Sequence, residues 1–378
     1  MKTPSAVLYE MGKSAPYAQS KPLVIEEIEL AGPGKGEVLV EIASAGLCHS
    51  DLSVINGSRP RGVPLVMGHE ASGVVRDVGP EVGDLRPGDH VVFSFVPICG
   101  HCAPCMDGRA ALCENGAKAN VAGTLLAGAK RFTHGKRGEL NHHLGVSAFS
   151  QFTVAAQESL VKIDSELPLD KAALFGCAVM TGVGAVMNTA RVEPGSSVAV
   201  FGLGGVGLSA ILGARASGAW PIIAVDLLAS KLELAKKLGA THAVNAKKVD
   251  PVEAVRELTN GGVKYAIESV GSERVLIQAY GATRRGGTTV TVGLPHPSKQ
   301  FSIPAVSLVA EERVIKGSYM GSAVPRRDIP RFIELYKAGL LPVDLLLSRT
   351  IRLDEINSAF DALASGEAVR QVIRFSNN

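Results

Sequence analysis

The stretch that decides the fold lies near the middle of the chain and reads Val198-Ala199-Val200-Phe201-Gly202-Leu203-Gly204-Gly205-Val206-Gly207. Its four apolar residues predict a buried strand, and the G-x-G-x-x-G glycines open a helix predicted over Gly205 to Ser217. The first glycine permits a tight turn, the second lets backbone approach a pyrophosphate, and the third lets the helix pack closely on the strand. Because a helix N-terminus favours negative charge, the stretch predicts a dinucleotide site made by Gly202, Gly204, Gly205, Val206 and Gly207.

An acidic residue completes this pattern. Asp226 follows the next predicted strand, Ile222 to Val225. A carboxylate at this place accepts hydrogen bonds from the adenosine ribose and repels a 2′-phosphate, so the sequence predicts NAD rather than NADP. Lys231 is a candidate for the same ribose, with an ordinary solvated lysine as the alternative.

Strands and helices continue to alternate around this motif. Asp250 and Pro251 read as an N-cap and first helical residue, with Glu253 reciprocating. The repeated β-α-β units predict a parallel sheet with helices on both faces. The remaining expected elements are a helix over Lys231 to Leu238, a helix from Pro251 closed by Gly261-Gly262, strands over Val263 to Ile267 and Thr288 to Val292, and a helical stretch between these strands that Gly286-Gly287 ends.

The segments on either side have a different character. Residues 1 to 178 contain short β-branched and aromatic runs (Val38 to Ile42, Gly73 to Val75, Val91 to Phe95) separated by turn residues, which predict a barrel-like antiparallel domain. Residues 179 to 320 form the predicted cofactor domain. Residues 321 to 378 are too short to stand alone, and we expect them to return to the first domain. Their expected elements are helices over Asp328 to Ala338 and Asp354 to Ala364 and a strand over Arg370 to Phe375.

Four of the six cysteines form one group. Cys99, Cys102, Cys105 and Cys113 have the spacing C-x2-C-x2-C-x7-C in a glycine- and proline-containing loop, which predicts a closed structural zinc site. Two disulfides or unpartnered buried thiols are the alternatives, and nothing at the N-terminus suggests an oxidising compartment. His101, inside the loop, is interpreted as a solvated residue because four sulfurs already fill the metal's shell.

A second metal site is indicated by Cys48-His49-Ser50-Asp51 and Met67-Gly68-His69-Glu70. Cys48 and His69 are donors that zinc prefers, and an open catalytic zinc takes three protein ligands. Cys177 is the cysteine that remains to supply the third.

Composition excludes several function classes. The 378 residues are 46% hydrophobic and 20% charged with a formal net charge of +3, so two domains are expected. No basic stripe indicates nucleic acid, and nothing indicates a membrane. Met1 to Glu10 lacks the features of a signal peptide, so a cytoplasmic location is expected.

Taken together, these motifs resemble the zinc-dependent medium-chain alcohol dehydrogenases over essentially the whole length. The resemblance rests on Gly68-His69-Glu70-x2-Gly73-x5-Gly79-x2-Val82, the four-cysteine loop, Cys177, the glycine motif with Asp226, and Val369-Arg370. It implies a GroES-like β-barrel catalytic domain and a Rossmann cofactor domain with the active site in the cleft between them. The long segment from Cys113 to Phe149 resembles the class I and class III-like forms and implies a homodimer, with a tetramer as the alternative.

The resemblance also implies roles for individual residues. Cys48, His69 and Cys177 would bind the catalytic zinc, Asp51 would orient His69, and Glu70 would lie behind the metal near Arg370. His49, Val292 and Arg370 match cofactor contacts, although a surface histidine is the alternative for His49. The substrate pocket is matched by Phe95, His143, Leu144, Leu294 and Tyr319.

The implied reaction is reversible oxidation of primary alcohols, aliphatic or aromatic, through a zinc alkoxide and hydride transfer to NAD. Ser50 is the expected first proton acceptor. Ser53 stands where several relatives carry a histidine, so the proton must leave through the cofactor ribose and water or through His49.

Other readings remain. A class III-type, thiol-dependent formaldehyde dehydrogenase would use Arg59, Arg61 or Arg131 for the adduct's carboxylates. A non-catalytic zinc-stabilised binding protein fits less well, because none of the predicted ligands and glycines is missing. A zinc-ribbon nucleic-acid module would have two separated C-x2-C pairs and a basic surface, and a zinc-free reductase would not need Cys48, His69 and Cys177 together.

Overall fold

The computed structural model describes residues 1–375. The chain divides into two compact units, which are described separately. The first unit holds Met1–Cys177, Val324–Pro330 and the chain from Leu347 onward, and the second holds Ala178–Ala323 and Arg331–Leu346.

A closed barrel forms one half of the first unit. In the order of pairing its strands are β1 (Lys2–Leu8), β2 (Leu23–Leu30), β7 (Phe132–His134), β8 (Gly138–His142) and β4 (Leu65–Val66). Apolar side chains such as Ile28, Phe132 and Leu140 fill it. The expectation of a purely antiparallel barrel is wrong at one pair, since β4 and β8 run parallel. The long connection between these strands makes a parallel pairing possible, whereas a tight hairpin would not.

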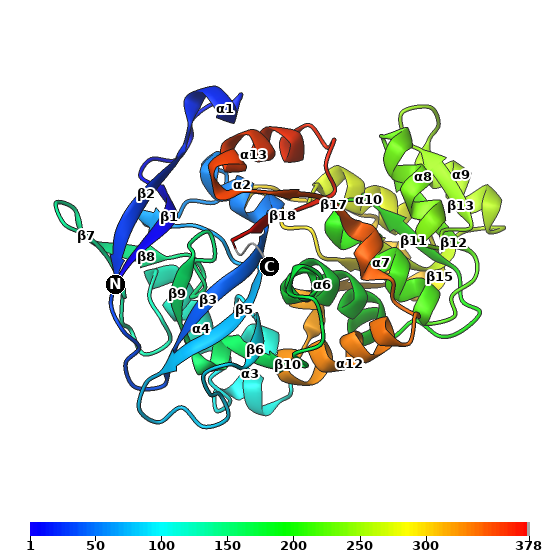
Figure 1. Cartoon of the computed structure of the whole chain (residues 1–378). Helices are drawn as coiled ribbons and strands as arrows, with labels where there is room; N and C mark the ends of the chain where they lie inside the picture. Colours follow the sequence, from blue (N-terminus) through cyan, green and yellow to red (C-terminus); the bar gives the residue numbers. More distant parts are fainter. Residues whose placement is uncertain (376–378) are drawn as a thin grey trace. The chain divides into compact units, whose positions relative to one another are not determined.

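A seven-stranded sheet forms the other half of the first unit (Figure 1). Its last strand in the chain, β18, pairs antiparallel with β3, with Val372 opposite Gly46. This pairing places Arg370 beside the segment that leads into Cys48. The strands follow the order β10 (Leu160–Ile163), β6 (His90–Phe93), β5 (Ala71–Val78), β3 (Glu37–Gly46), β18 (Arg370–Arg374) and β17 (Leu347–Ile351), with β9 (Phe152–Ala156) on β3.

Short helices connect these strands. α13, which carries the apolar stripe Ile356, Phe360 and Leu363, packs on α1 and α2, so the returning C-terminal segment covers the start of the chain. The helices of the first unit are α1 (Tyr17–Ser20), α2 (His49–Ile55), α3 (Ala103–Met106), α4 (Glu114–Ala122), α5 (Leu169–Ala172) and α13 (Ile356–Ala364).

The second unit contains a six-stranded parallel sheet. All four residues of β11 are buried, and because successive side chains point to opposite faces, both faces of the sheet are covered. Figure 1 shows the helices around it. The strands follow the order β13 (His242–Asn245), β12 (Ile222–Asp226), β11 (Val198–Phe201), β14 (Val263–Glu268), β15 (Thr283–Thr291) and β16 (Val314–Gly317). The helices are α6 (Ala178–Gly184), α7 (Gly205–Ala216), α8 (Ala229–Leu238), α9 (Pro251–Leu258), α10 (Glu273–Ala282) and α11 (Ala305–Ala310).

Most expected elements of this unit are present, and one boundary is wrong. Asp250 caps α9 as predicted, accepting from the backbone N–H groups of Val252 and Glu253. Gly286-Gly287, expected to end a helix, instead lie inside β15. α10 stops earlier, at Ala282, because Thr283 turns the backbone to an extended conformation and its hydroxyl donates to Ala279 O.

The expectation that all of 321 to 378 returns to the first unit is corrected for residues 321–323 and 331–346, which belong to the second unit. Residues 376–378 lie outside the described part of the chain. α12 (Pro325–Lys337) starts in the first unit and continues into the second. After it, Val343 and Leu346 are buried in a 3-10 turn that packs on α7. Burial of these apolar side chains holds this segment against the rest of the second unit.

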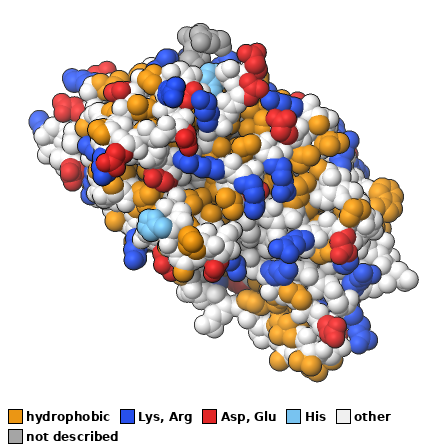
Figure 2. Space-filling view, turned by 90° about the horizontal axis from the view of Figure 1, so that it is seen from below, with side chains coloured by type: hydrophobic (Ala, Val, Ile, Leu, Met, Phe, Trp, Pro, Cys, Tyr) orange, Lys and Arg blue, Asp and Glu red, His pale blue; other side chains and the backbone are white. Residues whose placement is uncertain are grey.

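Charges of both signs are mixed with apolar side chains on the face shown in Figure 2, without a stripe of one sign. Within residues 1–375 no single helix has the length and apolarity needed to cross a membrane. One bent pair, Leu169–Gly176 with Ala178–Ala190, passes such a test on length and composition alone, and it is mostly buried in the structure.

Candidate catalytic metal centre and dinucleotide site

Cys48 is held at the start of α2. It is the N-cap residue, its sulfur accepts from the backbone N–H of Ser50 at 3.5 Å, and its own N–H donates to Asp51 Oδ2 at 3.1 Å. This reciprocal pair satisfies two helix N–H groups. These hydrogen bonds fix the position of the sulfur. The residue Cys48 is buried, with 7% of its surface exposed.

His69 lies between β4 and β5 and is almost completely buried. Its Nδ1 is 2.8 Å from Asp51 Oδ1, so the other nitrogen, Nε2, is free to face a metal in the neutral tautomer. Gly68 before it has φ +94, and a Cβ there would lie 2.5 Å from Phe149 N. Glycine is needed at this position both for the left-handed backbone and for the close approach.

Cys177 reaches the same point from a distant part of the chain. It follows the 3-10 turn Ala173–Gly176, and its sulfur is 3.4 Å from His69 Nε2. A Cβ on Gly176 would lie 2.5 Å from Phe93 O, so this turn can approach β6 closely only with glycine before the cysteine.

These side chains fit zinc. One donor atom from each of Cys48, His69, Glu70 and Cys177 lies within 4.8 Å of the others, and zinc–sulfur and zinc–nitrogen bonds of usual length place neighbouring donors about 3.5 Å apart. A hydrogen bond with Cys177 lowers the pKa of Cys48, and the same bond raises the pKa of Cys177. Zinc binds cysteine as the thiolate, and two cysteines with one histidine are a donor set found in catalytic zinc sites.

Glu70 is paired with a buried arginine. Its carboxylate forms an ion pair with Arg370, whose side chain is 3% exposed, and Arg370 also donates to Leu47 O at 3.3 Å. A Cβ on Gly46 would lie 2.8 Å from the Glu70 carboxylate. The predicted contact between Glu70 and Arg370 is therefore present in the structure.

Two of the predicted pocket residues contact His69. The rings of Phe95 and His143 lie edge-to-face with the His69 ring, at centroid distances of 5.5 and 5.6 Å. His143 Nδ1 is also 3.3 Å from Asp51 Oδ1. Asp51 therefore faces two imidazoles, and no motif in the chain predicted the second of these contacts.

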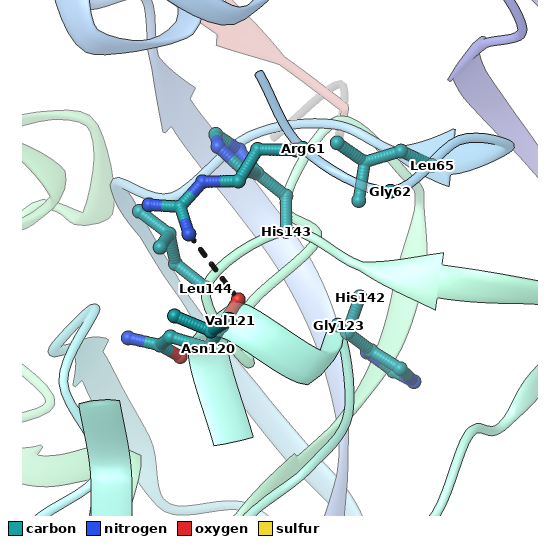
Figure 3. A pocket seen from close by; sticks show the side chains of 9 residues that line it. All are labelled: Arg61, Gly62, Leu65, Asn120, Val121, Gly123, His142, His143 and Leu144. Carbon is teal, nitrogen blue, oxygen red and sulfur yellow. Dashed lines mark hydrogen bonds between the residues drawn. The ribbon is translucent and has the colours of Figure 1, made fainter. Parts of the chain in front are cut away.

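Figure 3 shows a small hollow that has His143 on its wall. Its space is about 10 Å³, enough for about one water molecule. Arg61 reaches across it and donates to Asn120 O at 3.5 Å. The other residues on its walls are Gly62, Leu65, Val121, Gly123, His142, His143 and Leu144.

The four-cysteine loop forms a second cluster. One sulfur from each of Cys99, Cys102, Cys105 and Cys113 lies within 4.8 Å of the others, and all six cysteines are free of disulfides. Burial opposes ionisation of Cys99, but N–H donors from the backbone and from Asn115 outweigh it and lower the pKa of Cys99 to about 6. His101 is exposed, as expected, although its Nδ1 also lies 2.9 Å from Cys99 O. The cluster fits a closed structural zinc.

The glycine motif has the geometry that a dinucleotide requires. Gly202 has φ +87, and a Cβ on Gly207 would lie 1.9 Å from Gly202 O, so α7 packs as closely on β11 as predicted. Space around the Cα of Gly204, the N-cap of α7, is open. Asp226 ends β12 and accepts from Leu203 N at 2.7 Å, which holds the loop against the acidic residue. Lys231 is half-buried on α8.

The remaining predicted residues are distributed over both units. His49 is exposed and Ser50 half-buried on the first turn of α2 in the first unit. Val292, Leu294 and Tyr319 belong to the second unit. The sequence reading missed Glu268, a buried carboxylate at the end of β14. The signal that was present is a glutamate at the end of a strand of mostly apolar residues.

The comparisons with known proteins cover the whole chain. Residues 34–165 match the model of the alcohol dehydrogenase GroES-like domain, and residues 205–338 match that of the zinc-binding dehydrogenases. An S-(hydroxymethyl)glutathione dehydrogenase of Paracoccus denitrificans is 37% identical over 99% of this chain and 100% of its own. Alcohol dehydrogenase 1 of Pisum sativum is 40% identical over 99% and 97%.

A solved structure is also similar to this chain over its whole length. Benzyl alcohol dehydrogenase from Acinetobacter calcoaceticus has a TM-score of 0.92 and 34% identity, with 100% of both chains covered. With two zinc-type clusters, a GroES-like first unit and a Rossmann-type second unit, the chain belongs to the zinc-dependent alcohol dehydrogenase family of oxidoreductases.

Proposed function

We propose that this protein oxidises primary alcohols to aldehydes, reversibly, with NAD as the hydride acceptor. The observation that carries the proposal is the convergence of Cys48, His69 and Cys177 around one point, with Asp51 behind the histidine. Three protein ligands leave one position for a substrate oxygen, as in a catalytic zinc site. A zinc ion bound there supplies a Lewis acid that lowers the pKa of the substrate hydroxyl.

Ser50 is the residue proposed to take the alcohol proton. Its backbone N–H donates to the sulfur of Cys48, which keeps the serine directly beside a metal ligand. Ser53 lies one turn further along α2 and its hydroxyl donates to His49 O. The proton would therefore continue through the cofactor ribose and water, or through the exposed His49, rather than through Ser53.

The proposal for NAD rests on Asp226. Its carboxylate lies at the end of β12 and holds the glycine loop through Leu203 N. The free hydroxyls of a ribose can donate hydrogen bonds to this carboxylate, whereas the carboxylate repels a 2′-phosphate. Gly202, Gly204, Gly205, Val206 and Gly207 would bind the pyrophosphate. Lys231 would bind the same ribose, and Val292 and Arg370 are the other proposed cofactor contacts.

The substrate class follows from the apolar side chains near the ligands. Phe95 packs on His69, and Leu144 follows His143. These side chains are proposed to contact an alcohol with an aliphatic or aromatic body, and Leu294 and Tyr319 are the other proposed substrate contacts. The similarity to a benzyl alcohol dehydrogenase supports an aromatic substrate.

A second candidate is a glutathione-dependent formaldehyde dehydrogenase, and the relatives of that name favour it. Of the three arginines considered for the adduct's carboxylates, Arg131 and Arg61 differ in their contacts. Arg131 Nε donates to the carboxylate of the buried Glu37 at 2.6 Å. This ion pair already neutralises the charge of Arg131. Arg61, on the wall of the hollow beside His143, remains better placed.

We propose a homodimer whose interface is the edge strand of the sheet in the second unit. β16 is the last strand in the pairing order, and Val314 on it is 40% exposed. Val306 and Val309 of the preceding α11 are 70% and 82% exposed. An exposed apolar strand edge is a surface that a second copy can cover by pairing strands about a two-fold axis. Light scattering measures the molecular mass of the full chain and of its Val309→Asp variant. The parent chain should have the mass of a dimer and the variant a lower mass, whereas a monomeric parent chain would contradict the proposal.

The decisive experiment combines metal analysis with a substrate panel. Two zincs per chain and turnover of aliphatic and benzylic alcohols with NAD, much faster than with NADP, are expected. Formaldehyde oxidation that requires glutathione would favour the second candidate. A chain with two zincs and no turnover across the panel would contradict both.

A further inference from the structure

Glu268 is a buried carboxylate that joins the carboxyl ends of two parallel strands. It ends β14 and is 1% exposed. One of its oxygens, Oε1, accepts from Val270 N at 2.7 Å and from Gly271 N at 2.6 Å. The other, Oε2, accepts from the hydroxyl of Thr291, the last residue of β15, at 2.6 Å. The carboxylate therefore ties the turn after β14 to the end of β15.

The backbone of the same residue reinforces the connection. Glu268 O accepts from Val292 N at 2.9 Å and from Gly293 N at 3.4 Å. Ser269, the next residue, donates from its hydroxyl to Gly202 O at 2.9 Å. The turn 269–271 thus lies between the glycine motif on one side and the segment 292–294 on the other.

Close packing leaves these loops little freedom. A Cβ on Gly293 would lie 2.0 Å from Gly271 N, and a Cβ on Gly202 would lie 2.4 Å from the side chain of Val270. All three loops follow the carboxyl ends of β11, β14 and β15, which is where open parallel sheets bind their ligands. Any shift of the turn would move backbone on both sides of the proposed cofactor site.

A buried carboxylate without a cationic partner is costly for stability. In the part of the chain that the structure describes, no ion pair reaches Glu268. Its three charge-assisted hydrogen bonds offset part of this cost. What these hydrogen bonds provide is geometry, since they hold the turn 269–271 against the end of β15.

We propose that Glu268 is a positioning residue for the dinucleotide, which sets the spacing between the glycine motif and the segment 292–294 through the turn 269–271. The proposal rests on the proposed function, since it assumes that NAD is the ligand of the second unit. Glu268 itself does not contact the cofactor in this account.

The experiment compares four variants of the zinc-loaded full chain by NADH fluorescence titration, by steady-state kinetics in NAD and by thermal unfolding. Glu268→Ala removes all three side-chain bonds and should raise the Kd for NADH about tenfold or more. Glu268→Gln should rescue binding to within about threefold. Its amide oxygen can accept both backbone N–H groups while its nitrogen donates to Thr291.

Two threonine variants separate positioning from stability. Thr291→Val removes only the bond at the carboxyl end of β15 and should raise the Kd about threefold. Thr283→Val is the matched control, because Thr283 is a buried threonine at the opposite end of the same strand. It should lower the unfolding temperature and leave the Kd unchanged. In Glu268→Ala and Thr291→Val the KM for NAD should rise more than kcat falls.

The possible results are distinct. If the parent chain binds NADH and both Glu268→Ala and Thr291→Val retain its Kd, the positioning role is overturned and the proposed function stands. If Glu268→Ala does not fold, Thr291→Val against Thr283→Val decides. If the parent chain binds no NADH, the proposed function fails and this proposal fails with it.

Discussion

Asp51 Oδ1 lies 2.8 Å from Nδ1 of His69, on the side of the ring away from Cys177. Burial raises the pKa of Asp51, but the neighbouring His69 and His143 outweigh it and the net shift is downward. The carboxylate stays ionised and fixes the tautomer in which Nε2 carries the lone pair. A metal ligand oriented in this way binds more tightly than a free imidazole.

Asp51→Asn is therefore expected to weaken zinc binding at the catalytic site about 10- to 100-fold. The amide can keep one hydrogen bond but no longer supplies the charge behind the ring. Competition with a chelator, followed by metal analysis, measures the effect on one of the two zincs. Asp77→Asn, an exposed aspartate on β5, serves as the control. Equal zinc retention in both variants would contradict the role of Asp51.

The buried pair of Glu70 and Arg370 predicts a large loss of stability when only one partner is removed. Arg370→Met leaves the Glu70 carboxylate buried without its arginine and should cost about 3 to 5 kcal/mol of unfolding free energy. The double variant Glu70→Gln with Arg370→Met should recover much of this loss. Urea unfolding of the zinc-loaded proteins measures both. A double variant less stable than the single one would show that the charge pair is not the reason.

Ser50→Ala is expected to lower kcat for alcohol oxidation by about 10²- to 10⁴-fold, the usual range for a group that transfers a proton. Ser53→Ala should leave kcat close to that of the parent chain, because its hydroxyl donates to the helix carbonyl of His49. Steady-state kinetics with a good alcohol from the panel measures both. Small and equal effects would remove Ser50 from the proton path.

His142 predicts a specific sensitivity to acid. Burial, with added repulsion from Arg131 and Lys130, lowers the pKa of His142 from 6.5 to about 3. Between these two pKa values His142 binds a proton in the unfolded chain but not in the folded chain. Stability is complete above the unfolded pKa and falls by up to about 1.4 kcal/mol per pH unit as the pH drops toward the folded value.

His142→Gln should therefore show a shallower loss of stability between pH 6.5 and about 3. Glutamine keeps an acceptor for Arg131 N, which donates to His142 Nε2 at 3.1 Å. Unfolding midpoints of both proteins at equal zinc concentration, measured over this pH range, give the difference. Parallel curves would mean that His142 does not contribute to the acid response.

Local order in the chain was enough to identify the parts of this protein. The strand-glycine-helix pattern at Val198 to Gly207 depends on neighbouring residues, and β11 and α7 form where it predicts them. The cysteine spacing from Cys99 to Cys113 is likewise local, and its sulfurs do converge. Helix ends were less secure, as Gly286-Gly287 show. These glycines lie in β15 where its register on β14 shifts, and a glycine pair alone does not distinguish such an irregularity from a helix end.

Contacts between distant residues were decided by the tertiary structure alone. Cys177 meets His69 across 108 positions of the chain, and the sequence supplied only the count of cysteines that made this pairing plausible. The second imidazole on Asp51 and the attachment of residues 331–346 to the second unit had no local pattern at all. The place of Glu268 at the end of a strand did not show that its carboxylate bonds to Thr291. Each depends on how strands and loops are brought together by burial of apolar surface, which is a property of the whole fold and not of any short segment.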